Sequence, residues 1–240
     1  MSTMRRLLIG VVILLGLLAI ADRIAVVVAN RAVAKQIGSE LELASDPSVH
    51  IAGFPFLTQA IRGRYRDVHV QIPAVTSENL RNLDVDARLH GVHAPLSDLA
   101  GGKLDQVPVD DVTGSVLVHY DDLARASGIP GLSVQPVNGG LRVSGQVRVL
   151  GQTISASAVA HIAVQQGSLV VSADQATVNG APAPPAVVDA AARVLSFRVT
   201  PRQLPLGLRI TGVSTGPNAL TVSAQGTSVV LRRGTLAGVG

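Results

Sequence analysis

The chain has 240 residues, with 20 Lys or Arg against 16 Asp or Glu, and a length of this order is typical of one ordinary domain or two very small ones. It contains no cysteine, which excludes a disulfide scaffold, a cysteine–zinc site and a thiol nucleophile. Aromatic residues make up only 2%, and base-stacking nucleic-acid binders rely on aromatic platforms, so we expect no nucleic-acid partner.

The chain starts with two basic residues, Arg5 and Arg6, followed by an unbroken apolar run from Leu7 to Ala21. Fifteen helical residues rise about 22 Å, which is short of the roughly 30 Å hydrocarbon core of a bilayer. The basic start, the apolar run and the small-residue end Ala19-Ile20-Ala21 are typical of an export signal. The alternative is an uncleaved anchor with its basic end inside. Residues 1–21 are therefore predicted to be an export signal or N-terminal membrane anchor, and either role places the remainder outside the cytoplasm.

The next segments differ in their hydrophobic period. Over residues 24–43, apolar side chains recur every three or four positions, which predicts an amphipathic helix leading out of the apolar run. Beyond Pro47 the period changes to two, which indicates antiparallel strands with one apolar and one polar face. The clearest alternating segments are 68–72, 83–89, 141–149, 154–162 and 220–224.

Two shorter helices and a long loop complete the predicted elements. Asp121 or Asp122 can cap a helix that runs to Ala126, and Pro184-Pro185 can open another. Residues 94–111, rich in Gly and Pro, are expected to form the long loop. The prediction is one α+β domain over residues 22–233, with a large antiparallel sheet, a few helices and a flexible tail at 234–240.

The apolar face of such a sheet needs a cover that three helices can supply only in part. The sheet must curl on itself, stack on a second sheet, or leave a groove that something else fills. Its inward side chains are small and aliphatic, so an acyl chain is a suitable occupant, whereas a fully packed sandwich would show the same alternation. The expected acyl-chain lining is Val33, Ile37, Leu41, Val143, Val147, Ile154, Ala156, Ala158, Ala160, Leu220 and Val222.

A cluster of aromatic and basic residues follows the first helix. If the segment is extended, Arg62, Arg64 and Arg66 point to one side and form a guanidinium row that can bind a phosphate. Rings beside cations also suit a membrane interface. A core-filling Phe pair beside a solvated strand is the alternative. We expect the three arginines to hold a lipid head group, with a cavity mouth or membrane contact at Phe54, Phe56 and Tyr65.

The two motifs that suggest catalysis or metal binding are better explained by local structure. The G-x-S-x-G match at 212–216 precedes Pro217 and Asn218, which favours a turn between strands over a nucleophile elbow. His90 and His93 are three apart, and on a strand such positions face opposite sides. We therefore predict no catalytic residue, no metal site and no cofactor.

Several motifs together resemble the LmeA-like family of actinobacterial cell-envelope proteins. The likeness runs over most of residues 22–231. The motifs are Gly53-Phe54-Pro55-Phe56-Leu57, Val112-Thr113-Gly114-Ser115-Val116 leading into Tyr120-Asp121-Asp122-Leu123-Ala124, and the closing stretches 204–213 and 219–226.

The resemblance implies a non-catalytic phospholipid-binding protein of the periplasm and cell envelope. It implies a preference for phosphatidylinositol-type anionic lipids, a part in elongating mannan and lipomannan or in shuttling lipid, and envelope glycan-synthesis proteins as partners. It also implies a tubular lipid-binding fold, in which a curled antiparallel sheet wraps around a long N-terminal helix. The family supplies no ligand residues, so the arginine row rests on the spacing alone. A scaffold for an envelope synthase, or less readily an envelope hydrolase, is the alternative function.

Overall fold

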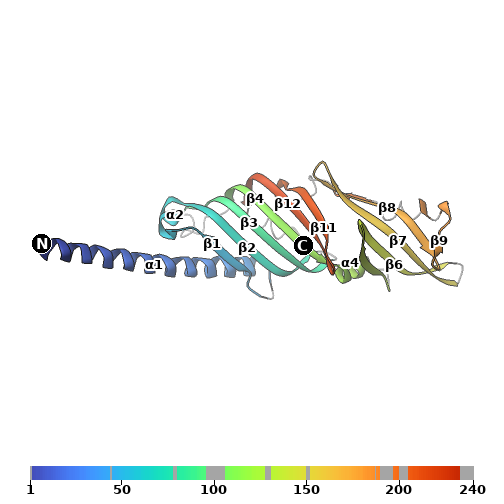
Figure 1. Cartoon of the computed structure of the whole chain (residues 1–240), viewed down its shortest axis with the longest axis horizontal. Helices are drawn as coiled ribbons and strands as arrows, with labels where there is room; N and C mark the ends of the chain where they lie inside the picture. The colour runs from blue at the N-terminus through green and yellow to red at the C-terminus, as the bar shows by residue number, and fades with distance from the viewer. Residues whose placement is uncertain are drawn as a thin grey trace.

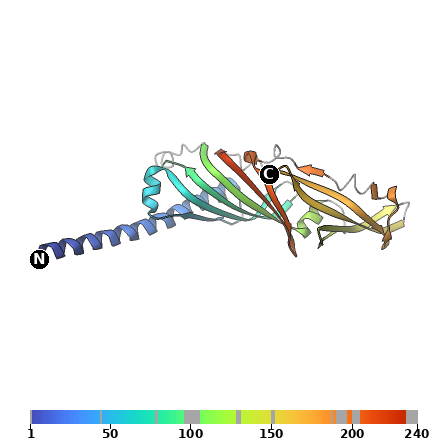
Figure 2. The same cartoon turned by 45° about the horizontal axis from the view of Figure 1, so that its top comes forward.

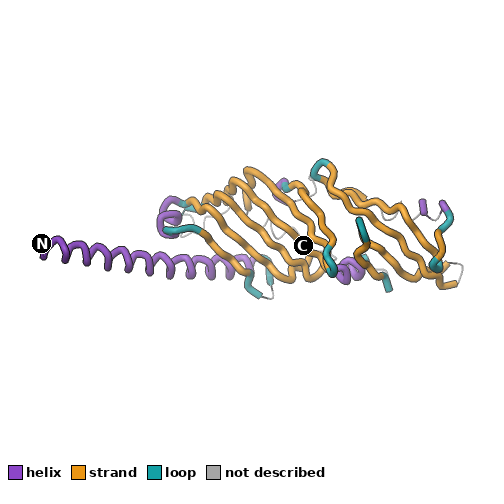
Figure 3. Tube along the Cα trace, viewed as in Figure 1, coloured by secondary structure: helices purple, strands orange, loops and turns teal. Residues whose placement is uncertain are grey.

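A computed structural model shows an elongated molecule with a projecting N-terminal helix and two antiparallel sheets along one axis (Figure 1). Figure 3 shows that strands make up most of the body behind this helix. The structure describes residues 2–43, 45–77, 80–95, 106–127, 131–149, 152–186, 188–189, 197–199 and 205–232.

Helix α1 (Ser2–Glu40) is continuous, so the apolar run and the predicted amphipathic helix are one element. No Pro interrupts it, and Asp22 and Arg23 change the polarity of the helix without ending it. Its first half is exposed, and it is long and apolar enough to cross a membrane. Its second half lies along the first sheet (Figure 2). Leu41, predicted within the helix, lies just beyond its end.

The first sheet has the strand order β1-β2-β3-β4-β12-β11, and all its pairs are antiparallel. Short helix α2 (Phe56–Arg62) separates its first two strands. The strands are β1 (Ser48–Ala52), β2 (Arg64–Ser77), β3 (Leu80–His93), β4 (Gln106–His119), β11 (Arg209–Thr215) and β12 (Ala219–Arg232).

The main core lies between this sheet and α1. Val26 and Ala34 of the helix are buried in one cluster with Phe56 of α2 and with Val70 and Val109 of the sheet. Val109 is only 1% exposed. The predicted 3.6-residue and two-residue periods thus meet in a single helix-on-sheet interface.

The second sheet has the order β10-β8-β7-β6-β5, with β9 paired to β8, and is antiparallel throughout. Helix α4 (Tyr120–Ala126) leads into it from the first sheet, and the 3-10 helix η2 (Pro205–Gly207) leads back. Its strands are β5 (Ser133–Val137), β6 (Gly140–Val149), β7 (Gln152–Gln165), β8 (Ser168–Val178), β9 (Ala181–Pro182) and β10 (Phe197–Val199).

A small apolar cluster joins the two sheets. Tyr120, Leu141 and Leu220 are buried in it, one from α4 and one from each sheet. The Tyr120 hydroxyl donates to the Gly216 carbonyl at 2.8 Å, and the Ile210 N–H donates to the Gly167 carbonyl at 3.2 Å. The sheets are therefore linked end to end and are not stacked face to face (Figures 1 and 2).

These features confirm the predicted α+β class, the long N-terminal helix and the large amount of antiparallel sheet. The sheet surface is not closed, and its strands divide between two sheets. The helix predicted after Asp121 is α4, which begins at Tyr120. The helix predicted from Pro184-Pro185 is helical at residues 185–186 and 188–189, and the rest of it lies outside the described residues.

The loop predicted at 94–111 is wrong in its last six residues, because Gln106–Asp111 belong to β4. Pro108 lies beyond the last β3 pair, where β4 pairs only with β12. Its missing N–H therefore removes no hydrogen bond to β3. Residues 96–105 of the predicted loop lie outside the described residues.

Candidate functional site

The segment expected to form one extended arginine row contains helix α2. Pro55 precedes the helix, and Gly63 closes it in the left-handed conformation, φ 63°, with its N–H donating to the Ala60 carbonyl. Arg62 is therefore the last residue of α2, whereas Arg64 and Arg66 lie two apart on β2. The row predicted from an extended backbone is wrong, because a helix separates its first member from the other two.

The three arginines nevertheless line one groove of about 400 Å³, because Gly63 turns the chain back from α2 into β2. Arg64 and Arg66 share a strand face, and Arg62 reaches the groove from the helix end. The groove is lined by Phe54, Pro55, Thr58, Gln59, Arg62, Arg64, Arg66, Gly91 and Asp110.

The charges in this arginine groove are only partly compensated. Asp110 accepts hydrogen bonds from Arg64 at 2.8 Å and from His93 at 2.9 Å. His93 and then Arg64 hold the pKa of Asp110 below its ordinary value, despite some desolvation. Among the described residues, none forms an ion pair with the Arg62 or Arg66 guanidinium. The groove thus presents two guanidinium groups available to an anion.

A buried glutamine fixes the floor of the groove. Gln59 is 7% exposed, and its side-chain N–H donates to the Ala52 carbonyl at 3.3 Å. Its side-chain oxygen accepts from the main-chain N–H of Arg66 at 3.0 Å. One side chain thus ties α2 to both β1 and β2. Sequence reasoning missed Gln59 and Asp110, although Pro55 and Gly63 at the two ends of α2 were a usable signal for the helix.

The aromatic residues of this region separate into an exposed ring and a buried pair. Phe54 is 62% exposed, and the Arg23 guanidinium lies over its ring at 5.1 Å. Phe56 and Tyr65 are each 6% exposed, with ring centroids 6.1 Å apart. Burial raises the pKa of Tyr65. Of the three rings expected at a cavity mouth, only Phe54 is at the surface, while the other two fill the first core.

The residues expected to line an acyl-chain cavity are distributed over the length of the molecule. Val33 and Ile37 of α1 pack against the main core. Leu220 is buried in the small cluster that joins the two sheets, and Val222 packs against that cluster. Two alanines of the second sheet, 158 and 160, are buried. Leu41, Val143 and Ala156 are half-buried, and the side chains of Val147 and Ile154 lie outside the described residues.

Half-buried apolar residues on the first sheet connect the main core with the junction. Val85 pairs with Val116, and Ala87 pairs with Gly114 in the next row. Val116 and Gly114 in turn pair with Val222 and Ala224 of β12. These paired residues are not among the buried members of the main core or of the cluster that joins the two sheets. This part of the apolar face therefore retains accessible surface for a hydrophobic ligand.

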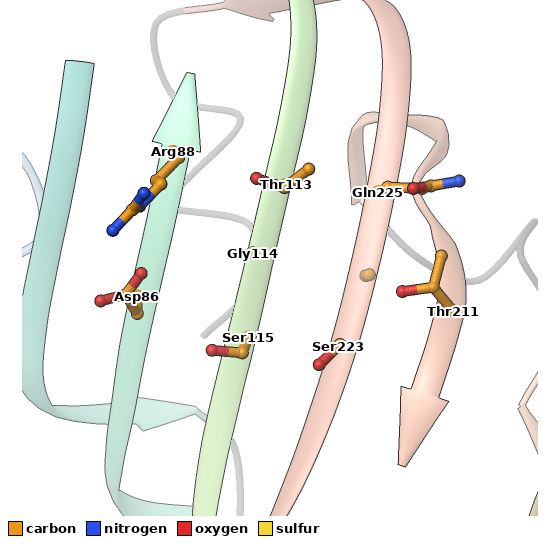
Figure 4. A pocket seen from close by; sticks show the side chains of 9 residues that line it. Asp86, Arg88, Thr113, Gly114, Ser115, Thr211, Ser223 and Gln225 are labelled. Carbon is orange, nitrogen blue, oxygen red and sulfur yellow. The ribbon is translucent and has the colours of Figure 1, made fainter. Parts of the chain in front are cut away.

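The opposite face of the same strands is polar and carries a shallow groove of about 270 Å³ (Figure 4). Asp86 accepts hydrogen bonds from His69 at 2.8 Å and from Gln71 at 2.9 Å. Burial raises the pKa of Asp86, but these two bonds outweigh it and the pKa lies below its ordinary value. Within the described part of the chain, no three His, Asp or Glu residues form a group suited to a metal ion.

An open antiparallel sheet with an apolar face, a helix long and apolar enough to cross a membrane and an arginine-lined groove beside helix α2 describe an α+β protein suited to a ligand that is both apolar and anionic. The model of the LmeA-like phospholipid-binding family matches residues 20–225, and the chain belongs to this family. The match covers the second half of α1 and most of both sheets. No curated protein and no solved structure matches the chain.

Proposed function

We propose that the protein binds an anionic phospholipid without catalysing its conversion. The head group occupies the arginine groove, which opens on the face of β2 opposite to buried Tyr65, and the acyl chains pass exposed Phe54 to reach the apolar face of the first sheet. The observation that carries this proposal is the convergence of Arg62, Arg64 and Arg66 on one groove beside exposed Phe54.

The groove chemistry suits a phosphate. Guanidinium groups bind phosphate oxygens through paired N–H donors, and each such bond is strengthened by charge. Arg64 is already bound to Asp110, so Arg62 and Arg66, which form no ion pair with another described residue, supply the donors for the phosphate. Asp110 then holds Arg64 in position and also repels a second anion, which favours a ligand with one phosphate per groove.

The apolar face suits the acyl chains. Transfer of a methylene group from water to an apolar surface contributes about 0.8 kcal/mol. Half-buried Val85, Val116 and Val222 offer such a surface without the cost of opening a packed core. Affinity of this kind comes from burial alone and requires no reacting group.

The family likeness supports the finer parts of the proposal. We infer that the lipid is of the phosphatidylinositol type, and that the protein acts in the cell envelope to support mannan and lipoglycan elongation or to shuttle lipid. The envelope glycan-synthesis proteins are its proposed partners. A ligand-free scaffold for an envelope synthase is the competing role, and native mass spectrometry of the purified chain separates the two by the presence of bound phospholipid.

The head-group assignment is tested with the double variant Arg62→Gln/Arg66→Gln in vesicle flotation. Each arginine near an anionic surface contributes about 1 kcal/mol, so we expect about 30-fold weaker binding to phosphatidylinositol vesicles. The control Arg142→Gln/Arg209→Gln removes two exposed arginines outside the groove. The assignment is wrong if both double variants weaken binding equally. A phosphatidylglycerol series shows whether inositol itself matters.

A further inference from the structure

Helix α1 extends beyond the apolar run Leu7–Ala21 in both directions, and this changes the length available for crossing a membrane. The twenty residues from Met4 to Arg23 rise about 30 Å, the thickness of a hydrocarbon core. The large apolar side chains along this stretch are all exposed. They are Met4, Leu7, Leu8, Ile9, Val11, Val12, Ile13, Leu14, Leu15, Leu17, Leu18 and Ile20.

The rest of the same helix is built into the domain. Asp22 is 2% exposed, and its carboxylate accepts the Leu57 N–H of α2 at 2.7 Å and the Arg23 guanidinium at 2.6 Å. Two turns further on, the Asn30 side-chain oxygen accepts the Ile51 N–H of β1 at 3.0 Å. Because the acid is covered by α2, it is withdrawn from the lipid-facing side of the helix. Cleavage after Ala21 would cut a continuous helix directly before its first contact with α2.

Exposed apolar side chains surround the point where α1 leaves the domain. Phe54 is 62% exposed and Ile61 79%, and on the helix itself Ile24 is 61% and Val28 60% exposed. Arg23 lies over the Phe54 ring. Exposed Phe and Ile side chains gain by entering the edge of the acyl layer, because burial removes their apolar surface from water, and a neighbouring arginine reaches the head-group phosphates.

We propose that α1 is retained as a membrane anchor, with the apolar run Leu7–Ala21 in the hydrocarbon core and Arg23 at its outer boundary, and that Phe54 and Ile61 insert into the outer leaflet beside Arg23. Arg5 and Arg6 lie at the opposite boundary, where their side chains extend toward the inner head groups. The partner of this surface is the bilayer that holds α1. The two contacts of Asp22 and Asn30 fix the domain on its anchor, so the arginine groove opens within the head-group layer of the same membrane.

The proposal does not depend on what the arginine groove binds. Insertion of Phe54 and Ile61 follows from the position of the anchor and from the exposure of these two side chains, and it would take place in a neutral bilayer. A protein that fails to select anionic lipid could therefore still be seated in this way, and the two proposals fail separately.

The absence of Trp from the chain makes a single introduced Trp a unique reporter. The full chain carrying Phe54→Trp is reconstituted into phosphatidylcholine vesicles with and without brominated acyl chains. We expect the emission maximum of Phe54→Trp to lie at a shorter wavelength than that of a water-exposed Trp. We also expect brominated lipid to remove most of the fluorescence intensity of Phe54→Trp. The matched control Gln135→Trp reports from an exposed position of the second sheet, and should show neither change. Ile61→Trp provides a second reporter on the exposed side of α2.

Two results would overturn the proposal. One is emission and quenching of Phe54→Trp and Ile61→Trp equal to those of Gln135→Trp, which would place the α2 end in water. The other is an intact mass of the exported chain that lacks residues 1–21, which would show that the anchor is removed. Retained mass together with quenching of both Phe54→Trp and Ile61→Trp supports it.

Discussion

The two sheets contain similar numbers of strands but differ in what covers them. In the first sheet, α1 and α2 bury a core that includes Phe56, Val70 and Val109. In the second sheet, the described apolar residues meet a helix only at the junction, where α4 contributes Tyr120. Among the described residues, the buried apolar side chains are therefore concentrated in the first sheet, beside the proposed anchor, and those of the second sheet are mainly small.

The polar faces of the two sheets differ as well. The first carries His–Asp pairs, His69 with Asp86 and His93 with Asp110. The second carries a shallow groove of about 360 Å³ lined mainly by Ser, Thr, Gln and Gly, among them Ser144 and Ser157. Among the described residues, the ion pairs between strands thus lie on the sheet with the larger core.

The largest expected effect comes from a charge placed in the main core. Val109→Asp puts a carboxylate at a site that is 1% exposed, at a cost of about 4 kcal/mol. Val143→Asp, at a half-buried position of the second sheet, should cost about 1 kcal/mol. Hydrogen exchange measured separately for β4 and β6 checks both. Equal losses of protection would show that the two sheets are equally packed.

A smaller effect is expected from alanine at left-handed glycines. Gly63 has φ 63°, and a Cβ there would lie 2.7 Å from the Pro95 Cα. Gly180 has φ 80° with no atom within 4 Å, so Gly180→Ala should cost about 1 kcal/mol from the backbone alone. Gly63→Ala should cost clearly more, because backbone must move. The difference in the free energy of unfolding between the two variants, measured in urea, gives the cost of the clash with Pro95. Similar urea midpoints for the two variants would contradict the close approach of Gly63 and Pro95.

The smallest effect concerns acid. Hydrogen bonds from His93 and Arg64 hold the pKa of Asp110 below its ordinary value of 3.8. Its contribution to stability is therefore present above 3.8 and lost as the pH falls through the folded-state pKa. The strands of the second sheet contain one acidic residue, Asp174.

We expect acid to remove hydrogen-exchange protection from β2 and β4 before β6 and β7. Asp110→Asn should flatten the acid dependence of the first sheet and leave that of the second unchanged. If both sheets lose protection at the same pH in the parent chain, the His–Asp pairs do not control acid sensitivity.

Local patterns predicted much of the fold. The helical period over 24–43 and the alternation in β2, β3, β7 and β12 correspond to elements of the structure, because each pattern is set by a face that must be buried. The helix α2 was missed, since seven residues are too few to show a period. Arg62, Arg64 and Arg66 were selected by spacing on a strand, but they converge because Gly63 folds a helix back onto β2.

Composition and periodicity by themselves determined the class of the protein: an apolar N-terminal helix, antiparallel strands with one apolar face, and no thiol chemistry. These follow from short-range physics, since hydropathy and backbone preference act within a few residues. Only the tertiary structure decided that the strands form two sheets, that Asp22 is covered by α2, and that Phe54 is exposed while Phe56 is buried. Those outcomes depend on contacts between residues tens of positions apart, which no local pattern encodes.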